Sequence, residues 1–484
     1  MQKYSKIIVL FLIFLLVSCS SSHSSNDSDI IPDSDIDSDD TETVDDDSDT
    51  QDFEIVDDSD ETPDADSEET SDGIFEKTQP INGYKRCYDK IPAGDYEGWF
   101  ANPYIESEVK RSLGYEQNYK LTEEDLEKVK EITIYSQDLR GIEKLVNLEK
   151  IQISGENVYD FTPLSGLTKL KELILDSEYM TCLDGSFSLL TTLETLEIEN
   201  THLKEINPIE QLVNLKTLEL SDNQIASLPE NLGNLQKLEW LAFDDNKIKN
   251  IEPLNLLINL KELFFHDNYV EDVSPLKDLV NLTRLGCNNN NIMDMSPVTN
   301  LVNLTYYLGL NQNRIEKIPK EIVNLKKLQE LDLTFNNISN LPNLKELSSL
   351  VTMRLSNNAL NNEDLMNLDD LESVKFLDVA LNKITKVPVM KNLKSLQELY
   401  LNYNSITDLS GFADNESFPA LKSVYLGSNK ISDAEALRKR KGLNRLSIGK
   451  NCIQDLSPLE ELKERGTYIS GMNEQLESCE DAGE

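Results

Sequence analysis

The chain is poor in histidine and in basic residues. Its three histidines, His23, His202 and His266, are too few for a multi-histidine metal site or histidine-based catalysis. Lys and Arg number 46 against 88 Asp and Glu, which gives a formal charge of −42 over 484 residues. So acidic a chain repels phosphate backbones, and we expect no nucleic-acid partner. No Gly-x-Ser-x-Gly, Walker-loop, His-Glu-x-x-His or Cys-x-x-Cys motif occurs, so we expect no enzyme, metal or cofactor.

The N-terminus holds an apolar run that is too short to cross a membrane. Ile7–Val17 has eleven residues, whereas a membrane-spanning helix needs about 20. Lys3 and Lys6 precede the run, and this order is typical of a secretory signal peptide. We therefore predict that residues 1–18 are a signal peptide.

The run ends in Leu16-Val17-Ser18-Cys19, which resembles a bacterial lipobox. The resemblance implies that the signal is cut before Cys19 and that Cys19 is lipidated, so several acyl chains anchor the protein to a membrane. By resemblance to Gram-negative lipoproteins, Ser20 implies the outer membrane and cell surface. The alternative is an ordinary signal peptide followed by a chance cysteine.

Residues 20–80 contain 24 acidic residues against one basic residue, Lys77. Like charges at this density keep a chain extended and prevent it from burying a core. We predict a disordered tether over residues 19–80. The alternating Asp residues also suggest a calcium loop. However, an EF-hand needs a Gly at its turn, and Gly73 lies outside the Asp runs.

Residues 129–476 repeat with a step of mostly 22 or 23 residues. The pattern is L-x-x-L-x-L-x-x-N-x-L, as in Leu215, Leu218, Leu220, Asn223 and Ile225. About fifteen repeats start at residues 129, 148, 170, 193, 215, 238, 260, 282, 305, 328, 350, 374, 396, 421 and 443. A partial unit follows around Tyr468, and the repeat at 305 has one inserted residue, Tyr306 or Tyr307.

Each repeat is expected to form a short strand, a turn and a return segment. An Asn occupies the turn in the units from Asn223 to Asn473, where its amide can satisfy buried backbone groups. The first four units carry other residues there, so we expect looser turns; these residues are Gln137, Glu156, Glu178 and Thr201.

The array resembles the leucine-rich repeat family, in particular the 22-residue type of internalins. The internalin-like motif appears as Val270-Glu271-Asp272-Val273-Ser274-Pro275-Leu276 and again at residues 453–459. The resemblance implies an α/β solenoid, a horseshoe with a parallel concave sheet and a helical N-terminal cap. It also implies a monomeric, non-catalytic surface protein that binds a protein or glycan. The alternative is a regulatory subunit of an enzyme such as a protein phosphatase, which the signal peptide disfavours.

Both ends of a solenoid must be covered. We assign residues 81–128 to an N-terminal cap, with a helical pattern at residues 104–114 and a near capping box at Thr122 and Asp125. Residues 81–99 match no known pattern. Residues 477–484 are assigned to a C-terminal tail.

Beside Cys19 the chain has five cysteines, and export makes disulfides possible. Cys452 and Cys479 lie where the last repeat must be sealed, so we expect a bridge between them. Cys287 takes an inward Leu position, which predicts a core residue. Cys87 and Cys182 have no evident partners in the sequence.

The side chains that flank the inward Leu residues should face outward on the concave sheet. In the N-terminal strands they are acidic: Glu172, Asp176, Glu197, Glu199 and Glu219. Later they include Trp240, Phe264, His266, Arg284, Tyr307, Arg354, Phe376, Tyr400 and Tyr425. These residue types are common in binding hot spots. We predict that they bind the ligand and that a basic part of it faces the acidic strands. The alternative is that the aromatic rings only shield the sheet.

Overall fold

The computed structural model describes residues 74–77, 79–84, 87, 90–155, 158, 160–177, 180–438 and 440–480. The predicted signal peptide, Cys19 and most of the predicted tether lie outside these residues, as do Glu156 and Glu178. All described residues belong to one compact unit within 71–484.

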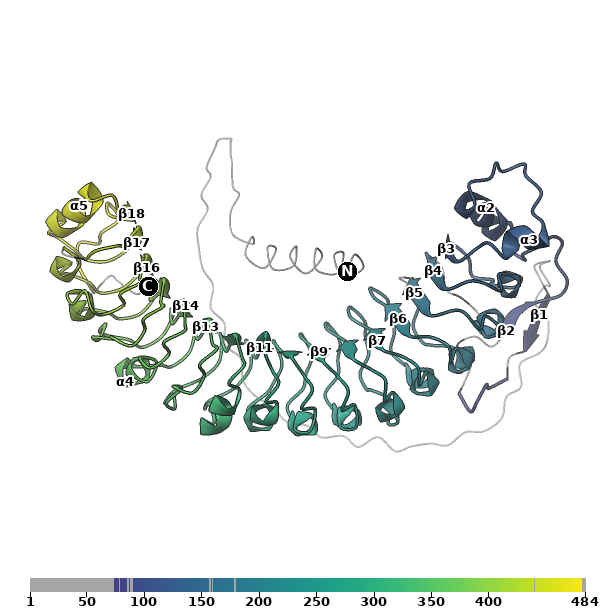
Figure 1. Ribbon diagram of the computed structural model, residues 1–484, viewed down its shortest axis with the longest axis horizontal. Coiled ribbons are helices and arrows are strands. Elements are labelled where there is room, and N and C mark those ends of the chain that lie inside the picture. Colours follow the sequence, from purple (N-terminus) through teal and green to yellow (C-terminus); the bar gives the residue numbers. More distant parts are fainter. Residues whose placement is uncertain are drawn as a thin grey trace, which may run out of the picture. The chain divides into compact units, whose positions relative to one another are not determined.

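Sixteen parallel strands form one sheet in which every strand pairs with the next one along the chain (Figure 1). The strands are β3 (Glu131–Ile134), β4 (Lys150–Ser154), β5 (Glu172–Asp176), β6 (Thr195–Ile198), β7 (Thr217–Glu219), β8 (Trp240–Ala242), β9 (Glu262–Phe264), β10 (Arg284–Gly286), β11 (Tyr307–Gly309), β12 (Glu330–Asp332), β13 (Thr352–Arg354), β14 (Phe376–Asp378), β15 (Glu398–Tyr400), β16 (Ser423–Tyr425), β17 (Arg445–Ser447) and β18 (Tyr468–Ser470). The strands line the concave side of a horseshoe, as predicted, with one strand for each repeat and one for the partial unit.

The Leu-type positions of all repeats stack into one continuous core. Leu218, Leu241 and Leu263 lie opposite one another in the sheet and are fully buried. Because each apolar side chain is covered by the repeats before and after it, the fold is stabilised by stacking.

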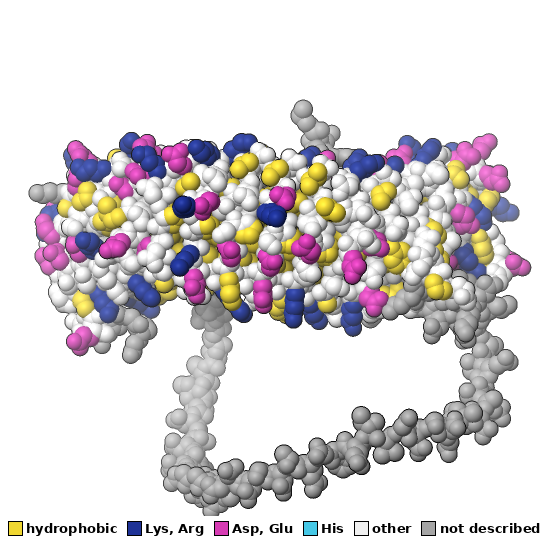
Figure 2. Space-filling view, turned by 90° about the horizontal axis from the view of Figure 1, so that it is seen from below, with side chains coloured by type: hydrophobic (Ala, Val, Ile, Leu, Met, Phe, Trp, Pro, Cys, Tyr) yellow, Lys and Arg dark blue, Asp and Glu magenta, His cyan; other side chains and the backbone are white. Residues whose placement is uncertain are grey.

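The return segments of this solenoid are mostly short 3₁₀ turns. They are Ile142–Lys144, Thr162–Leu164, Gly185–Leu189, Asn207–Gln211, Leu232–Asn234, Glu252–Leu254, Ser274–Leu276, Ser296–Asn300, Lys320–Asn324, Ser410–Phe412 and Glu435–Leu437. The described array contains two α-helices, α4 (Asn362–Met366) and α5 (Ser457–Glu464). A 22-residue period leaves too few residues for a full α-helix in most returns. Figure 2 shows this convex side, where acidic, basic and apolar side chains are interspersed.

Asparagine side chains tie the turns together from Asn223 to Asn451. Asn336 is typical and is 7% exposed. Its Nδ2 donates to the carbonyls of Leu310, Leu333 and Thr334 at 2.9–3.3 Å, and its Oδ1 accepts from Ile315 N at 2.9 Å. One amide thus satisfies backbone groups in two adjacent repeats.

The last unit differs from the prediction. Asn473 is exposed, and Gln475 takes the ladder position. Its Nε2 donates to Ile448 O and Gly471 O, both at 3.0 Å, and its Oε1 accepts from Ile453 N at 3.3 Å. Gln475 lies two residues after the predicted ladder residue Asn473, and its side chain, which is longer than that of Asn, reaches the same kind of backbone groups.

The first turns contain buried hydroxyl groups in place of the asparagines. Ser136, Ser154 and Ser177 are buried, and Thr201 hydrogen-bonds to the side chain of Asn223 where the ladder begins. The Ser136 hydroxyl donates to Asp138 O at 2.7 Å and accepts from Asn102 Nδ2 at 2.9 Å. A serine reaches fewer backbone groups than an asparagine.

The described residues between 74 and 99 are attached to the first repeats. They include the antiparallel strands β1 (Ile74–Lys77) and β2 (Lys90–Ala93), and β1 falls within the range predicted for the tether. The apolar pair Ile74-Phe75 interrupts the acidic run and permits a strand.

A disulfide joins Cys87 to Cys182, with Cα atoms 6.0 Å apart, although neither had an evident partner in the sequence. The pairing joins residues 95 positions apart, so no local pattern reveals it. Nearby, Tyr84 Oη donates to Glu210 Oε1 at 2.5 Å, and Asn82 Nδ2 donates to Ser188 Oγ at 2.8 Å. Residues 79–99 therefore brace the repeats that lack the asparagine ladder.

Two helices cover the N-terminal end of the core. They are α2 (Pro103–Ser112), whose N-cap Asn102 accepts from Tyr104 N at 3.0 Å, and α3 (Glu123–Leu126). The capping box of Thr122 and Asp125 is present. The buried residues Ile105, Val109 and Leu126 form the apolar contact with the array.

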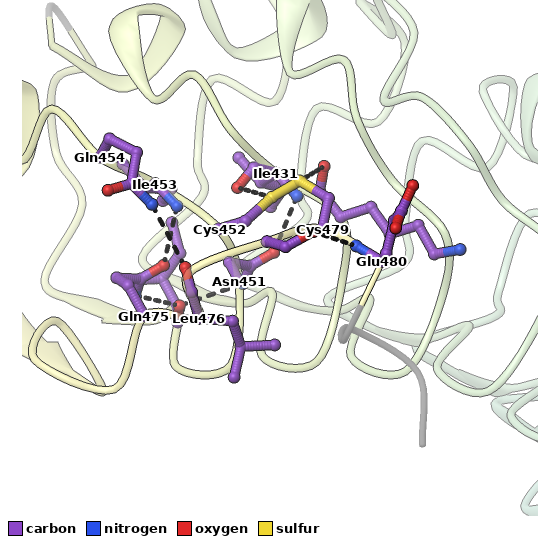
Figure 3. Close-up of a disulfide and its surroundings, with 12 residues drawn as sticks. Ile431, Asn451, Cys452, Ile453, Gln454, Gln475, Leu476, Cys479 and Glu480 are labelled. Atoms are coloured by element: carbon purple, nitrogen blue, oxygen red, sulfur yellow. Dashed lines mark hydrogen bonds between the residues drawn. A yellow bond between two sulfur atoms is a disulfide. The ribbon is translucent and has the colours of Figure 1, made fainter.

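The C-terminal end is sealed by α5, β18 and a disulfide between Cys452 and Cys479, whose Cα atoms lie 5.2 Å apart (Figure 3). Leu476 N also donates to Asn451 O at 2.5 Å. The predicted tail 477–484 is thus tied to the last repeat through Cys479.

A ladder of charged side chains precedes the strands of the first seven repeats. The residues alternate in sign: Lys130, Glu149, Lys171, Glu194, Lys216, Glu239 and Lys261. Ion pairs join Lys130 to Glu149 (3.1 Å), Glu194 to both Lys171 (3.1 Å) and Lys216 (2.6 Å), and Glu239 to Lys261 (2.7 Å). Exposed pairs of this kind stabilise by at most about 1 kcal/mol each.

Candidate functional site

The candidate site is the concave surface, where each repeat presents the residues that flank its inward Leu side chains. We number the positions of a repeat from its first Leu; positions 3, 5 and 7 line the sheet, as predicted. Position 8 directly precedes the ladder Asn and forms a border at the end of the strands.

Trp240, Phe264 and His266, all predicted to face outward, lie in two repeats, and their side chains are not equally exposed. Phe264 and His266 belong to the same repeat. Phe264 is only 5% exposed, because the rings of Trp240 and His266 lie 6.3 and 6.1 Å from it. Gly286 on β10 leaves room for this packing, since a Cβ there would lie 2.8 Å from Phe264 Cδ1. Phe264 therefore packs against the rings of Trp240 and His266.

His266 has a structural role. The ring Nδ1 of His266 accepts from the backbone N–H of Asn288 at 3.0 Å. The backbone N–H of His266 donates to Asp244 Oδ1 at 2.5 Å. Ser221 and Asn288 likewise accept the backbone N–H of the next repeat at 3.0 Å, so position 7 forms a second ladder. Burial lowers the pKa of His266 to about 4, which keeps the ring neutral at physiological pH.

The inserted residue of the repeat at 305 lies before Tyr307, because Tyr307 is in register with Arg284. Tyr306 is therefore pushed outward and is 51% exposed, and the Arg284 guanidinium lies 5.0 Å from its ring centroid. The Tyr307 hydroxyl accepts from Asn288 Nδ2 at 3.0 Å, and its ring lies across Gly309. Burial raises the pKa of Tyr307 above its ordinary value.

Arg354, Phe376, Tyr400 and Tyr425 stack across four successive strands, β13 to β16, and we call them the aromatic ladder. The Arg354 guanidinium lies 5.2 Å from the Phe376 centroid and pairs with Glu330. Tyr400 lies 5.0 Å from Phe376 and stacks on Tyr425 at 4.1 Å with a 9° tilt. All four side chains are half-buried, so their rotamers are fixed while their edges remain accessible.

The N-terminal strands form an acidic zone with Glu197, Glu199 and Glu219. Burial, together with the neighbouring carboxylates, raises the pKa of all three, and that of Glu219 reaches about 7. Asp244 follows on the next repeat, where burial likewise raises its pKa. A basic group placed here would lower these pKa values and favour the charged forms.

Sequence reasoning missed four exposed apolar residues of this surface: Tyr306, Phe335, Leu381 and Tyr403. The last three occupy position 8, which the rule of alternating strand side chains does not cover. The sequence could have identified them, because each directly precedes a ladder Asn at a position where other repeats have polar residues.

Other chemistry finds no support among the described residues. They contain no cluster of His, Cys, Asp and Glu with the arrangement of a metal site. Burial raises the pKa of the Cys287 thiol, which therefore stays protonated in the core. No helix in the described ranges is long and apolar enough to span a membrane.

Comparisons with known proteins agree with this architecture. Residues 282–458 match the family model "Leucine-rich repeat region", and residues 214–235 match "Leucine Rich Repeat". The chain is 40% identical to human Toll-like receptor 1 over 53 residues. That match covers 11% of this chain and 7% of the receptor, so it concerns repeats and not the whole receptor.

Two solved bacterial structures are similar over most of the chain. An internalin (InlF) from Listeria monocytogenes has a TM-score of 0.55 and 23% identity, over 77% of this chain and 95% of that one. A leucine-rich repeat protein of Leptospira interrogans has a TM-score of 0.62 and 24% identity, over 73% and 99%. Residues 214–235 and 282–458 thus match leucine-rich repeat models, and the described array shares the solenoid fold of these bacterial structures.

Proposed function

We propose that this protein is a lipid-anchored protein of the bacterial cell surface that binds a protein ligand on its concave sheet without catalysis. The aromatic ladder carries the proposal. Stacked Tyr, Phe and Arg side chains lose little conformational freedom on binding, and they are enriched in interface hot spots. Rings that served only to shield the sheet would not need the ion pair and stacking that fix their edges.

The binding test uses the double variant Tyr400→Ala, Tyr425→Ala. The full-length chain is immobilised, proteins from a cell-surface extract are captured, and the affinity of each captured protein is measured. The variant should bind at least tenfold more weakly, a loss of about 1.4 kcal/mol. The control Leu256→Ala removes an exposed side chain beside the return turn Glu252–Leu254 and should bind normally.

If Leu256→Ala weakens binding and the variant Tyr400→Ala, Tyr425→Ala does not, the binding site lies on the convex side. Loss of capture after periodate oxidation of the extract would identify the ligand as a glycan instead of a protein.

The anchor is tested at Cys19. Cys19→Ala should move the protein from the membrane fraction to the soluble fraction, because acylation requires the thiol. Ser20→Asp is the matched variant, and it should remain membrane-bound but shift from the outer to the inner membrane. A Cys19→Ala protein that still partitions into detergent would refute the lipoprotein assignment.

A further inference from the structure

Three exposed apolar side chains belong to repeats that carry or adjoin the strands of the aromatic ladder. Phe335, Leu381 and Tyr403 occupy position 8 of their repeats and are 49, 43 and 56% exposed. We call them the apolar rim. Their backbone N–H groups donate to Ser356 O, Asn402 O and Gly427 O at 2.9–3.0 Å, so the rim is as firmly held as the sheet.

The rim residues have an unfavourable backbone conformation. Their φ angles are +54°, +52° and +55°, in the left-handed region that bulky L-residues rarely adopt. Asn and Asp tolerate this region best. The other ladder repeats have polar residues at position 8: Asp222, Asp245, Asp267, Asn289, Gln312, Asn357, Ser428 and Lys450. Stability alone would favour Asn at all three rim positions.

The rim thus combines backbone strain with exposed apolar surface, and neither stabilises the free protein. Strained residues that persist in a rigid frame are a feature of functional sites, and clustered exposed apolar groups mark contact surfaces. The rim residues follow β12, β14 and β15 in the chain, and β14 and β15 also carry Phe376 and Tyr400 of the aromatic ladder.

The charge of the neighbouring sheet defines the partner further. Positions 3 and 5 of β12 to β15 carry four carboxylates, Glu330, Asp332, Asp378 and Glu398, against one cation, Arg354. The partner must therefore supply positive charge. At a strand spacing of about 4.8 Å, the rim spans about 15 Å, which is the length of four to five extended residues.

We propose that the apolar rim and the aromatic ladder together bind an extended segment of a partner protein in which large apolar and basic side chains alternate. In an extended chain successive side chains point to opposite sides. One set would contact the rim while the other faces the carboxylates of the sheet. This inference rests on the proposed concave-face function and specifies the partner.

The test uses a labelled eight-residue peptide of alternating Lys and Leu, and its binding to the full-length chain is followed by fluorescence anisotropy. The rim variant is Phe335→Asn, Leu381→Asn, Tyr403→Asn. It should bind the peptide at least tenfold more weakly while its melting temperature rises, because strain is relieved. Peptides of alternating Lys and Ser, or Glu and Leu, should also bind at least tenfold more weakly.

The control Gln312→Asn, Lys450→Asn makes the same change at position 8 outside the rim, and it should raise the melting temperature without loss of affinity. Equal affinity in the rim variant, or no binding of the Lys-Leu peptide to the unaltered chain, would overturn the inference. If the rim variant binds normally and the double variant Tyr400→Ala, Tyr425→Ala binds weakly, the role of the rim is refuted and the concave-face function stands. If neither variant changes the binding, both fail.

Discussion

The first four repeats and the eleven that follow satisfy their turns by different chemistry. From Asn223 onward each turn is tied by an asparagine that reaches two repeats. Before it, Ser136, Ser154 and Ser177 occupy the turns, and a covalently attached segment braces the repeats from outside. The sheet continues through both regions, so a solenoid can hold its register either by an internal polar ladder or by an external clamp.

The largest effect on stability is expected from removing the disulfide between Cys87 and Cys182, which attaches the external segment to the first repeats. Cys87→Ser with Cys182→Ser should lower the free energy of unfolding of the N-terminal repeats by about 3 kcal/mol, because the bridge closes a long loop. Hydrogen exchange should show faster opening of β4 to β6 and unchanged protection of β11 to β15. Uniform loss along the array would show that the two regions unfold as one.

Removing one side chain of the asparagine ladder should lower the free energy of unfolding by somewhat less. Asn336→Ala removes four hydrogen bonds from a buried turn and should destabilise the protein by about 2 kcal/mol in chemical denaturation. Asn473→Ala is the matched control, since Asn473 is exposed and Gln475 holds the ladder position, and its effect should be close to zero. A stable Asn336→Ala protein would mean that water replaces the amide.

At the boundary of the two regions, Glu219 should make stability depend on pH. Its folded pKa of about 7 lies above the unfolded value of about 4.3, so the folded state retains a proton that the unfolded state loses. Stability from this group is therefore present below pH 4 and declines as pH rises to 7. Glu219→Gln keeps the acceptor for Ser221 N and should stabilise by about 1 kcal/mol at pH 8, but not at pH 4. A pH-independent difference would contradict this.

The smallest effect is expected at the C-terminal end. Gln475→Ala should destabilise by about 0.5 kcal/mol, because Gln475 is half-buried and makes three such hydrogen bonds instead of four. A loss as large as that of Asn336→Ala would show that the terminal unit is required for the whole array.

The sequence predicted the solenoid, its strands, the cap and most of the ladder, since these follow from a periodic pattern in which each unit repeats the same contacts. It could not predict the Cys87–Cys182 pairing, because the partners lie 95 residues apart and Cys87 lies outside the repeats. It placed Phe264 and His266 on the correct face. Their roles depended on Gly286 and Asn288 in the next repeat, and the pattern of a single repeat does not contain such cross-strand relations.

The alternating charges before the strands also affect how the chain assembles. Repeats this similar could stack out of order, with one unit looped out and the next bonded in its place. Skipping any unit between Lys130 and Lys261 would bring like charges together, Lys130 beside Lys171 or Glu149 beside Glu194. Each such junction would exchange a weak attraction for a repulsion of similar size. The alternation of charge thus disfavours an array in which one repeat is skipped, because like charges then become neighbours. An array that skips two repeats keeps opposite charges side by side and is not disfavoured in this way.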